Sequence, residues 1–139
     1  MEGNNVAYTI VKDYVPAAKY ARKCPYTMKA KSITVHNTWN DAPAVNEVTY
    51  MKNNDKYVSF HDAVDDKEVR LAVPHTRNTF HAGDGKDGKG NRTSIGIEIC
   101  YSRSGGKKYE MAEENAVHYI ASLLKQYGWG VDRVKQHYD

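Results

Sequence analysis

The chain has 139 residues, 40% of them hydrophobic and 27% charged, which is ordinary for one globular domain with a buried core. The net charge of +3 is mild and the lysines are scattered, so the charge pattern requires no nucleic-acid partner. Two cysteines make no disulfide scaffold, no apolar run is long enough to span a membrane, and no charged-then-apolar leader opens the chain, so we expect a protein made in the cytoplasm without a signal peptide.

The first half of the chain is expected to alternate between strands and helices. Residues 6–15 suit an edge strand, and residues 19–23 a basic turn or short helix. An Asn-Asp pair followed by Pro marks the start of a helix over residues 40–53. Residues 57–64 read as a strand that returns through a tight turn to a hairpin partner at residues 68–73.

The second half opens with a glycine-rich loop at residues 79–91, which has neither the spacing of a phosphate-binding loop nor the terminal Glu of a calcium loop. SIGIEICY at residues 94–101 is a clear strand. Residues 111–127 form the longest predicted helix, which Gly128 ends, and residues 131–139 lead through a turn into a final strand. We therefore expect an α/β fold: a single domain with a central mixed β-sheet flanked by helices.

Residues 31–38, KSITVHNT, form the strand on which the functional prediction depends. Side chains alternate along a strand, so Ile33 and Val35 share an apolar face while His36 lies on the other. An imidazole at the end of a buried strand is held rigidly, as a metal ligand or proton carrier must be. A core histidine with both nitrogens satisfied is the alternative.

Glu98 is the second informative position. It lies between Ile97 and Ile99, and a carboxylate in a buried strand is costly unless it is paired, hydrogen-bonded, protonated or facing a metal. If the long helix covers the aliphatic face of the sheet, the other face gathers His36, His61 and Glu98. Asp62 falls on the apolar side and breaks this pattern. A structural ion pair is the alternative role for Glu98.

The ordered set of motifs resembles the type-2 N-acetylmuramoyl-L-alanine amidases, which include catalytic domains of phage endolysins and Bacillus autolysins. The motifs are VHNT, SFHDAVDD, HAGDG, SIGIEIC and KQHYD, and the resemblance spans about residues 23–139. It implies a bacteriolytic zinc hydrolase that acts on the cell wall and cleaves the amide between N-acetylmuramic acid and L-alanine in peptidoglycan. Its partner would be a muramyl peptide, with neither nucleic acid nor membrane involved, and we expect a monomer.

The resemblance also implies roles for individual residues. His36 and His137 match the first and second zinc ligands, and Glu98 matches the carboxylate that acts as general base or steers the attacking water. His61 and Phe60 match a strand position where some relatives carry a catalytic tyrosine, a role that Phe60 has no hydroxyl to fill. The residues expected to line the substrate groove are His61, His81, Asn37, Thr38 and Phe60.

The end of the chain departs from the family pattern. Relatives supply a third ligand, Cys or Asp, eight residues past the second histidine, whereas this chain stops two residues past His137. We therefore expect residues 1–139 to be an amidase-like catalytic domain truncated at its C-terminal end, with Asp139 or Cys100 as poor substitute ligands. The alternatives are a non-catalytic peptidoglycan-binding module of the same fold and a metal-free α/β domain with Glu98 in a salt bridge.

Overall fold

A computed structural model of the chain describes residues 8–83, 85 and 88–137. Its six strands form one sheet in the order β1-β4-β3-β5-β2-β6. Among the described strands, β3 and β4 pair antiparallel and the other neighbours pair parallel, which confirms the predicted mixed sheet. The strands are β1 (Thr9–Lys12), β2 (Ser32–Asn37), β3 (Asp62–Val64), β4 (Glu68–Leu71), β5 (Ser94–Ile99) and β6 (Val134–Gln136).

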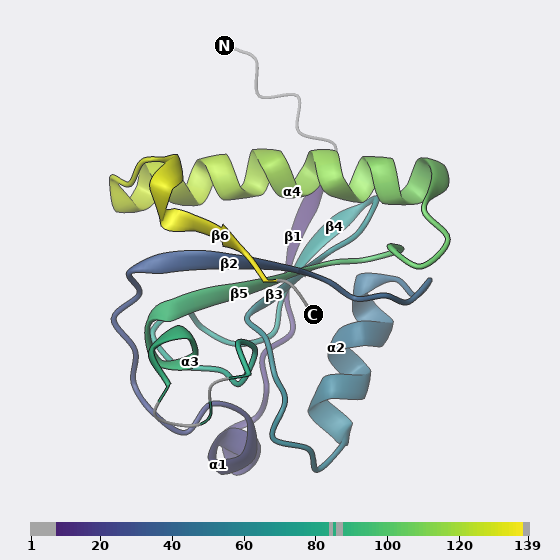
Figure 1. Cartoon of the computed structure of the whole chain (residues 1–139). Helices are drawn as coiled ribbons and strands as arrows, with labels where there is room; N and C mark the ends of the chain where they lie inside the picture. The colour runs from purple at the N-terminus through teal and green to yellow at the C-terminus, as the bar shows by residue number, and fades with distance from the viewer. Residues whose placement is uncertain (1–7, 84, 86–87, 138–139) are drawn as a thin grey trace.

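Helices lie on both faces of the sheet, with α4 on one face and the shorter helices on the other (Figure 1). In the described part of the chain no helix is both long and apolar enough to cross a membrane. The helices are α1 (Tyr20–Lys23), α2 (Ala44–Asn53), α3 (Lys89–Thr93) and α4 (Gly106–Tyr127), with 3-10 turns η1 (Ala17–Lys19) and η2 (Val131–Arg133).

Helix α4 covers the aliphatic face of the sheet, as predicted. Its buried stripe of Ala112, Ala116, Tyr119 and Leu123 repeats at intervals of four, three and four residues and packs on the isoleucines of β2 and β5. Gly128 ends the helix in the left-handed conformation with φ of 70°, a backbone geometry that favours glycine. This packing leaves the opposite face of β2 and β5 available for polar side chains.

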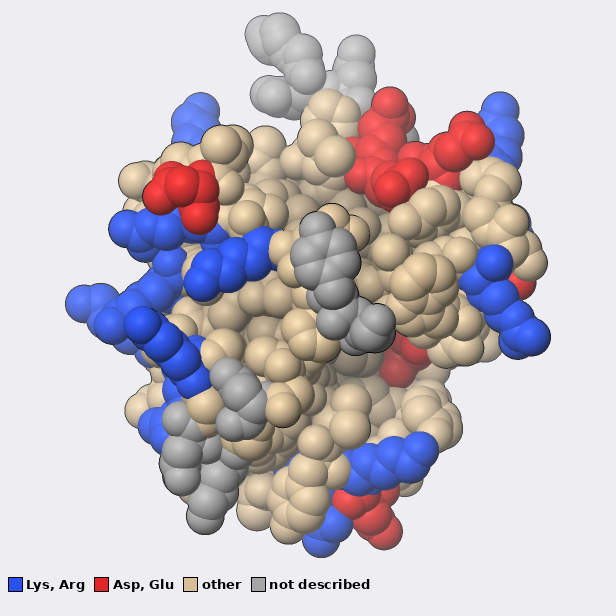
Figure 2. All heavy atoms as spheres, in the orientation of Figure 1, with Lys and Arg blue, Asp and Glu red and all other residues tan. Residues whose placement is uncertain are grey.

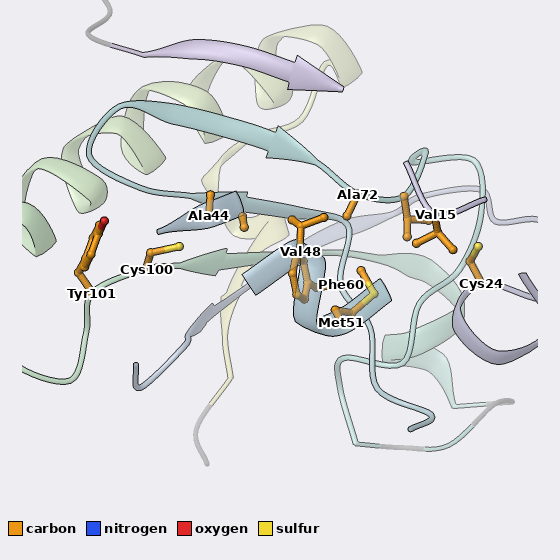
Figure 3. Packing of buried hydrophobic residues seen from close by; sticks show 11 residues of the cluster. Val15, Cys24, Ala44, Val48, Met51, Phe60, Ala72, Cys100 and Tyr101 are labelled. Atoms are coloured by element: carbon orange, nitrogen blue, oxygen red, sulfur yellow. The ribbon is translucent and has the colours of Figure 1, made fainter. Parts of the chain in front are cut away.

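Helix α2 covers part of that opposite face, over β3 and β4. Val48 and Met51 on α2 point toward Phe60 and Ala72 in a second apolar cluster (Figure 3). Cys100 is fully buried in the same cluster, and burial, followed by nearby acidic groups, strongly raises the pKa of its thiol. It is a packed thiol, so this position does not suit the substitute ligand considered from the sequence.

Several local predictions differ from the structure; for example, the helix predicted over residues 40–53 begins only at Ala44. The strand expected over residues 57–64 is restricted to β3, because the N–H of Ser59 bonds to the carbonyl oxygen of Phe80 in a loop. Helix α4 begins at Gly106, five residues before the start of the helix predicted over residues 111–127. Val117 on the same helix is 65% exposed, because the helix packs through its Tyr119 side.

The α4 face also buries a carboxylate, which explains why Asp62 broke the apolar pattern. Asp62 is fully buried, and its Oδ2 accepts hydrogen bonds from His75 Nε2 at 2.7 Å and from the Tyr119 hydroxyl at 2.7 Å. Burial disfavours the charged imidazole, but the Asp62 charge and its hydrogen bond outweigh burial and raise the pKa of His75. The pair is a structural ion pair that joins β3 to α4 and to the loop after β4.

This pair predicts a pH dependence of folding. The folded-state pKa of His75 is above its usual value of 6.5. The stabilisation that the His75–Asp62 ion pair gives the folded state is therefore complete below pH 6.5 and is lost as pH rises through the folded-state pKa. We expect urea unfolding to show the wild-type chain losing stability across this interval. His75→Asn should remove that slope, and an unchanged slope in the variant would assign the effect to other groups.

Candidate active site

The site begins with two buried histidines from different parts of the chain. His36 lies on β2 with 6% of its surface exposed, and His81 lies in the loop before α3 with 9% exposed. His36 Nε2 and His81 Nδ1 are 3.0 Å apart and hydrogen-bonded. The side-chain Oδ1 of Asn91 holds this loop by accepting the N–H groups of His81 and Ala82, at 2.8 and 2.7 Å.

His137 joins this pair from the other side of β2. It follows β6, and its N–H donates to the carbonyl oxygen of Val35 at 3.0 Å, which extends the pairing of β6 with β2. The rings of His36 and His137 are 4.7 Å apart between centroids. The parallel pairing of β2 and β6 therefore brings together the two histidines predicted as metal ligands.

Glu98 lies on the neighbouring strand at the same level. In the register of β2 with β5 it is the direct partner of His36, and across β3 its partner is Ala63. Glu98 lines a cavity of about 260 Å³ together with His81, Phe60 and Glu47. Glu47 is the second acidic side chain that lines this cavity, and burial raises its pKa. Phe60, expected among the groove-lining residues, lines this cavity and packs at the same time in the apolar cluster under α2.

His61 occupies an interior position. It is fully buried, its Nε2 donates to the carbonyl oxygen of Arg77 at 2.7 Å, and its Nδ1 accepts the Gly96 N–H at 2.9 Å. Burial, together with the charges of His75 and His81, lowers the pKa of His61 well below its usual value, so the ring stays neutral. This position does not support direct substrate contact by His61, which instead holds β5 against the loop after β4.

The hydrogen bonds of Asn37 and Thr38 direct these two side chains to other parts of the fold than His36 and His81. Asn37 points toward the α4 face, where its Oδ1 accepts the hydroxyl of Tyr109 at 3.0 Å. The Thr38 hydroxyl accepts the N–H of Asn40 at 3.3 Å and shapes the turn after β2. These contacts do not support the predicted groove-lining role: strand alternation puts Asn37 on the face opposite His36, and the Thr38 hydroxyl is used by the turn.

An open groove of about 710 Å³ runs up to His81 and His137. Its walls include Tyr26, Tyr57 and Phe80. The guanidinium of Arg92 lies 4.2 Å from the centre of the Tyr26 ring and that of Arg22 lies 4.4 Å from the centre of the Tyr57 ring. In Figure 2 Lys and Arg gather along the left edge of the molecule, while the middle of the view is mostly uncharged. The groove thus offers aromatic and apolar surface next to the histidines.

The donors present suit zinc but do not complete a site. Two imidazoles in contact, with a carboxylate at the same strand level, are the ligand types that zinc prefers, and catalytic sites normally use three protein ligands. Within residues 8–83, 85 and 88–137, no three His, Cys, Asp or Glu side chains are arranged to hold a metal ion. Asp139, considered as a substitute ligand, lies outside the described residues, as do Asp84 and Asp87 of the glycine-rich loop.

Comparison with known proteins gives the family. Residues 26–139 match the Amidase_2 family, described as N-acetylmuramoyl-L-alanine amidase. The chain belongs to this amidase family. The resemblance seen in the ordered motifs is therefore confirmed.

Several relatives are closely similar to this amidase domain. It is 56% identical to the N-acetylmuramoyl-L-alanine amidase CwlA of Bacillus subtilis strain 168 over 134 residues, 96% of this chain and 49% of CwlA. It is 57% identical to XlyB of the same strain over 130 residues, 94% of this chain and 41% of XlyB. The chain thus spans about half the length of the curated relatives it matches. The solved structure of PlyL matches with 53% identity and a TM-score of 0.89, covering 93% of this chain and 80% of PlyL.

The aromatic walls of the groove in this amidase domain were not assigned to particular residues from the sequence. Tyr57 and Val58 were assigned to a strand, but they are 61% and 57% exposed and face the groove. Tyr57 and Phe80 pack edge to face with centroids 5.8 Å apart. The available signal was compositional: the chain has eleven tyrosines in 139 residues, and exposed aromatic rings often line sugar or peptide grooves.

Proposed function

We propose that this domain hydrolyses the amide between N-acetylmuramic acid and L-alanine in bacterial peptidoglycan, as a zinc-dependent endolysin or autolysin. The observation that carries the proposal is the convergence of His36, His137 and Glu98 beside an aromatic groove in a chain of this family. Peptidoglycan is the expected partner, since the similar proteins CwlA and XlyB are named as amidases of this specificity.

His36 and His137 would hold the zinc ion, with further ligation from outside the described residues. Zinc supplies Lewis-acid chemistry, which polarises a carbonyl and lowers the pKa of water. Glu98, in the cavity beside His81, would accept a proton from the attacking water and pass it to the leaving amine. The groove would hold the substrate, with the rings of Tyr26 and Tyr57 stacking on apolar faces of sugar or peptide.

The experiment is a zinc titration combined with an assay on purified cell walls. We expect chelation to abolish release of new L-alanine amino termini and added zinc to restore it, both for this chain and for a fusion carrying the C-terminal continuation of CwlA. Stoichiometric zinc without any release of L-alanine termini from either protein would contradict the proposal.

A second candidate function is a peptidoglycan-binding module without catalysis. The observation in its favour is that no three-ligand set occurs among the described side chains. This function predicts that the chain and the fusion both sediment with cell walls, hold no zinc and release no L-alanine termini. Retention of one zinc together with turnover would exclude it.

A further inference from the structure

We propose that His81 is a positioning residue that fixes the tautomer of His36, so that His36 binds zinc through Nδ1. The zinc ion in this inference rests on the proposed function, whereas the tautomer of His36 depends only on hydrogen bonds within this chain. It adds to the zinc site a residue that the family resemblance treats only as part of the groove.

The direction of the hydrogen bonds follows from their last acceptor. His81 Nε2 is 2.9 Å from the carbonyl oxygen of Ser94, and a carbonyl oxygen only accepts, so this nitrogen carries a hydrogen. A neutral imidazole has one donor and one acceptor nitrogen, so His81 Nδ1 is the acceptor. The group 3.0 Å from it, His36 Nε2, must then be the donor. The two hydrogen bonds therefore form a relay, in which His36 donates to His81 and His81 donates to the backbone carbonyl of Ser94.

This relay determines which nitrogen of His36 can bind a metal. With hydrogen on Nε2, the lone pair of the neutral ring is on Nδ1. Metal-binding histidines commonly donate their second ring N–H to a neighbouring acceptor, which orients the ring and increases its basicity as a ligand. Both rings are buried, with 6% and 9% exposure, so bulk water competes little for these hydrogen bonds.

Gly96 on β5 makes room for the relay. A Cβ atom at this position would lie 2.5 Å from His81 Cγ, 2.7 Å from Cδ2 and 2.9 Å from Nδ1, closer than such contacts allow. The His81 ring therefore lies directly over the backbone of Gly96, between Ser94 and Glu98 on the same strand. A side chain at position 96 would move the ring that accepts from His36.

The first test reads the tautomers directly. Long-range ¹H–¹⁵N spectra of the labelled, metal-free chain at mildly alkaline pH should show hydrogen on Nε2 of both His36 and His81. Hydrogen on Nδ1 of His36 would overturn the inference. Because this measurement needs neither zinc nor turnover, it is independent of the proposed function.

The second test uses a pair of variants at His81. His81→Phe keeps a ring over Gly96 but removes the acceptor, and should weaken zinc binding by about 10–100-fold. His81→Asn keeps an acceptor near the Nδ1 position and should recover much of this loss. Equal zinc affinity of His81→Phe and the wild-type chain would overturn the inference, as would equal loss in both variants.

Gly96→Ala gives an independent check on the same geometry. It should weaken zinc binding in the wild-type background, because the methyl group displaces the His81 ring. In a His81→Ala background the same change should have no further effect on zinc affinity, and an undiminished effect there would contradict the relay. If neither the chain nor the fusion binds zinc, the proposed function fails, while the imidazole spectra still decide the tautomers.

Discussion

Glu98→Gln is expected to lower the rate of peptidoglycan hydrolysis by about 10²–10⁴-fold, the range for loss of a general base. Glutamine has the size of glutamate and retains an oxygen acceptor, so the strand and its register with His36 should persist. The measurement is the initial rate of release of L-alanine termini from cell walls, with zinc content and circular dichroism recorded for each protein.

The matched control is Glu47→Gln, because Glu47 is the other carboxylate of the same cavity and accepts a hydrogen bond from Asn40 at 3.0 Å. It should leave the rate near that of the wild-type chain. A Glu98→Gln variant with full zinc content and an unchanged rate would remove Glu98 from the mechanism, and a large loss in Glu47→Gln alone would move the role to Glu47.

Lys23→Met is expected to destabilise the fold by about 3 kcal/mol, because it removes a fully buried ammonium group and leaves three partly buried oxygen acceptors without their donor. The side chain is fully buried, and Nζ donates to Asn54 Oδ1 at 2.8 Å and to the carbonyl oxygens of Lys56 and Val58 at 2.7 and 3.1 Å. These contacts tie α1 to the segment that carries Tyr57 into the groove wall. Urea unfolding at neutral pH measures the change in the free energy of unfolding.

Lys19→Met is the matched control from the same short segment. Its Nζ donates to the end of α2, to the carbonyl oxygen of Lys52 at 2.6 Å and to Asn53 Oδ1 at 3.3 Å, but the side chain is only partly buried. Water can replace those contacts, so the loss should be about 1 kcal/mol. A similar loss of unfolding free energy in the two variants would show that burial does not strengthen the contribution of the Lys23 hydrogen bonds to stability.

Much of the fold could be predicted from the alternation of apolar residues, because this pattern depends only on residues a few positions apart. The isoleucines of β5 alternate with Gly96 and Glu98. This alternation alone places the isoleucines on one face of the sheet and Gly96 and Glu98 on the other. The apolar period of α4 and the glycine after it predicted a long amphipathic helix and its end. The start of α4 was predicted at residue 111 rather than Gly106, since glycines disfavour a helix interior; Gly105 and Gly106 both have positive φ, and the helix begins at the second.

The site was predicted in part, and for a different reason in each case. His36 and Glu98 follow from strand alternation, and their partnership follows from the register of β2 with β5. His137 and the zinc role came from the family resemblance. The burial of Lys23 left no sequence signal, because a lysine in a basic segment reads as a surface residue.

The sequence by itself determined which residues are apolar, where strands and helices form and which side chains share a face, because these depend on neighbours a few positions apart. Only the tertiary structure decided that His81 hydrogen-bonds to His36, 45 residues away, and that His61 is enclosed while Tyr57 is exposed. Strand order and loop packing set these contacts, and they depend on distant parts of the chain that no local period encodes.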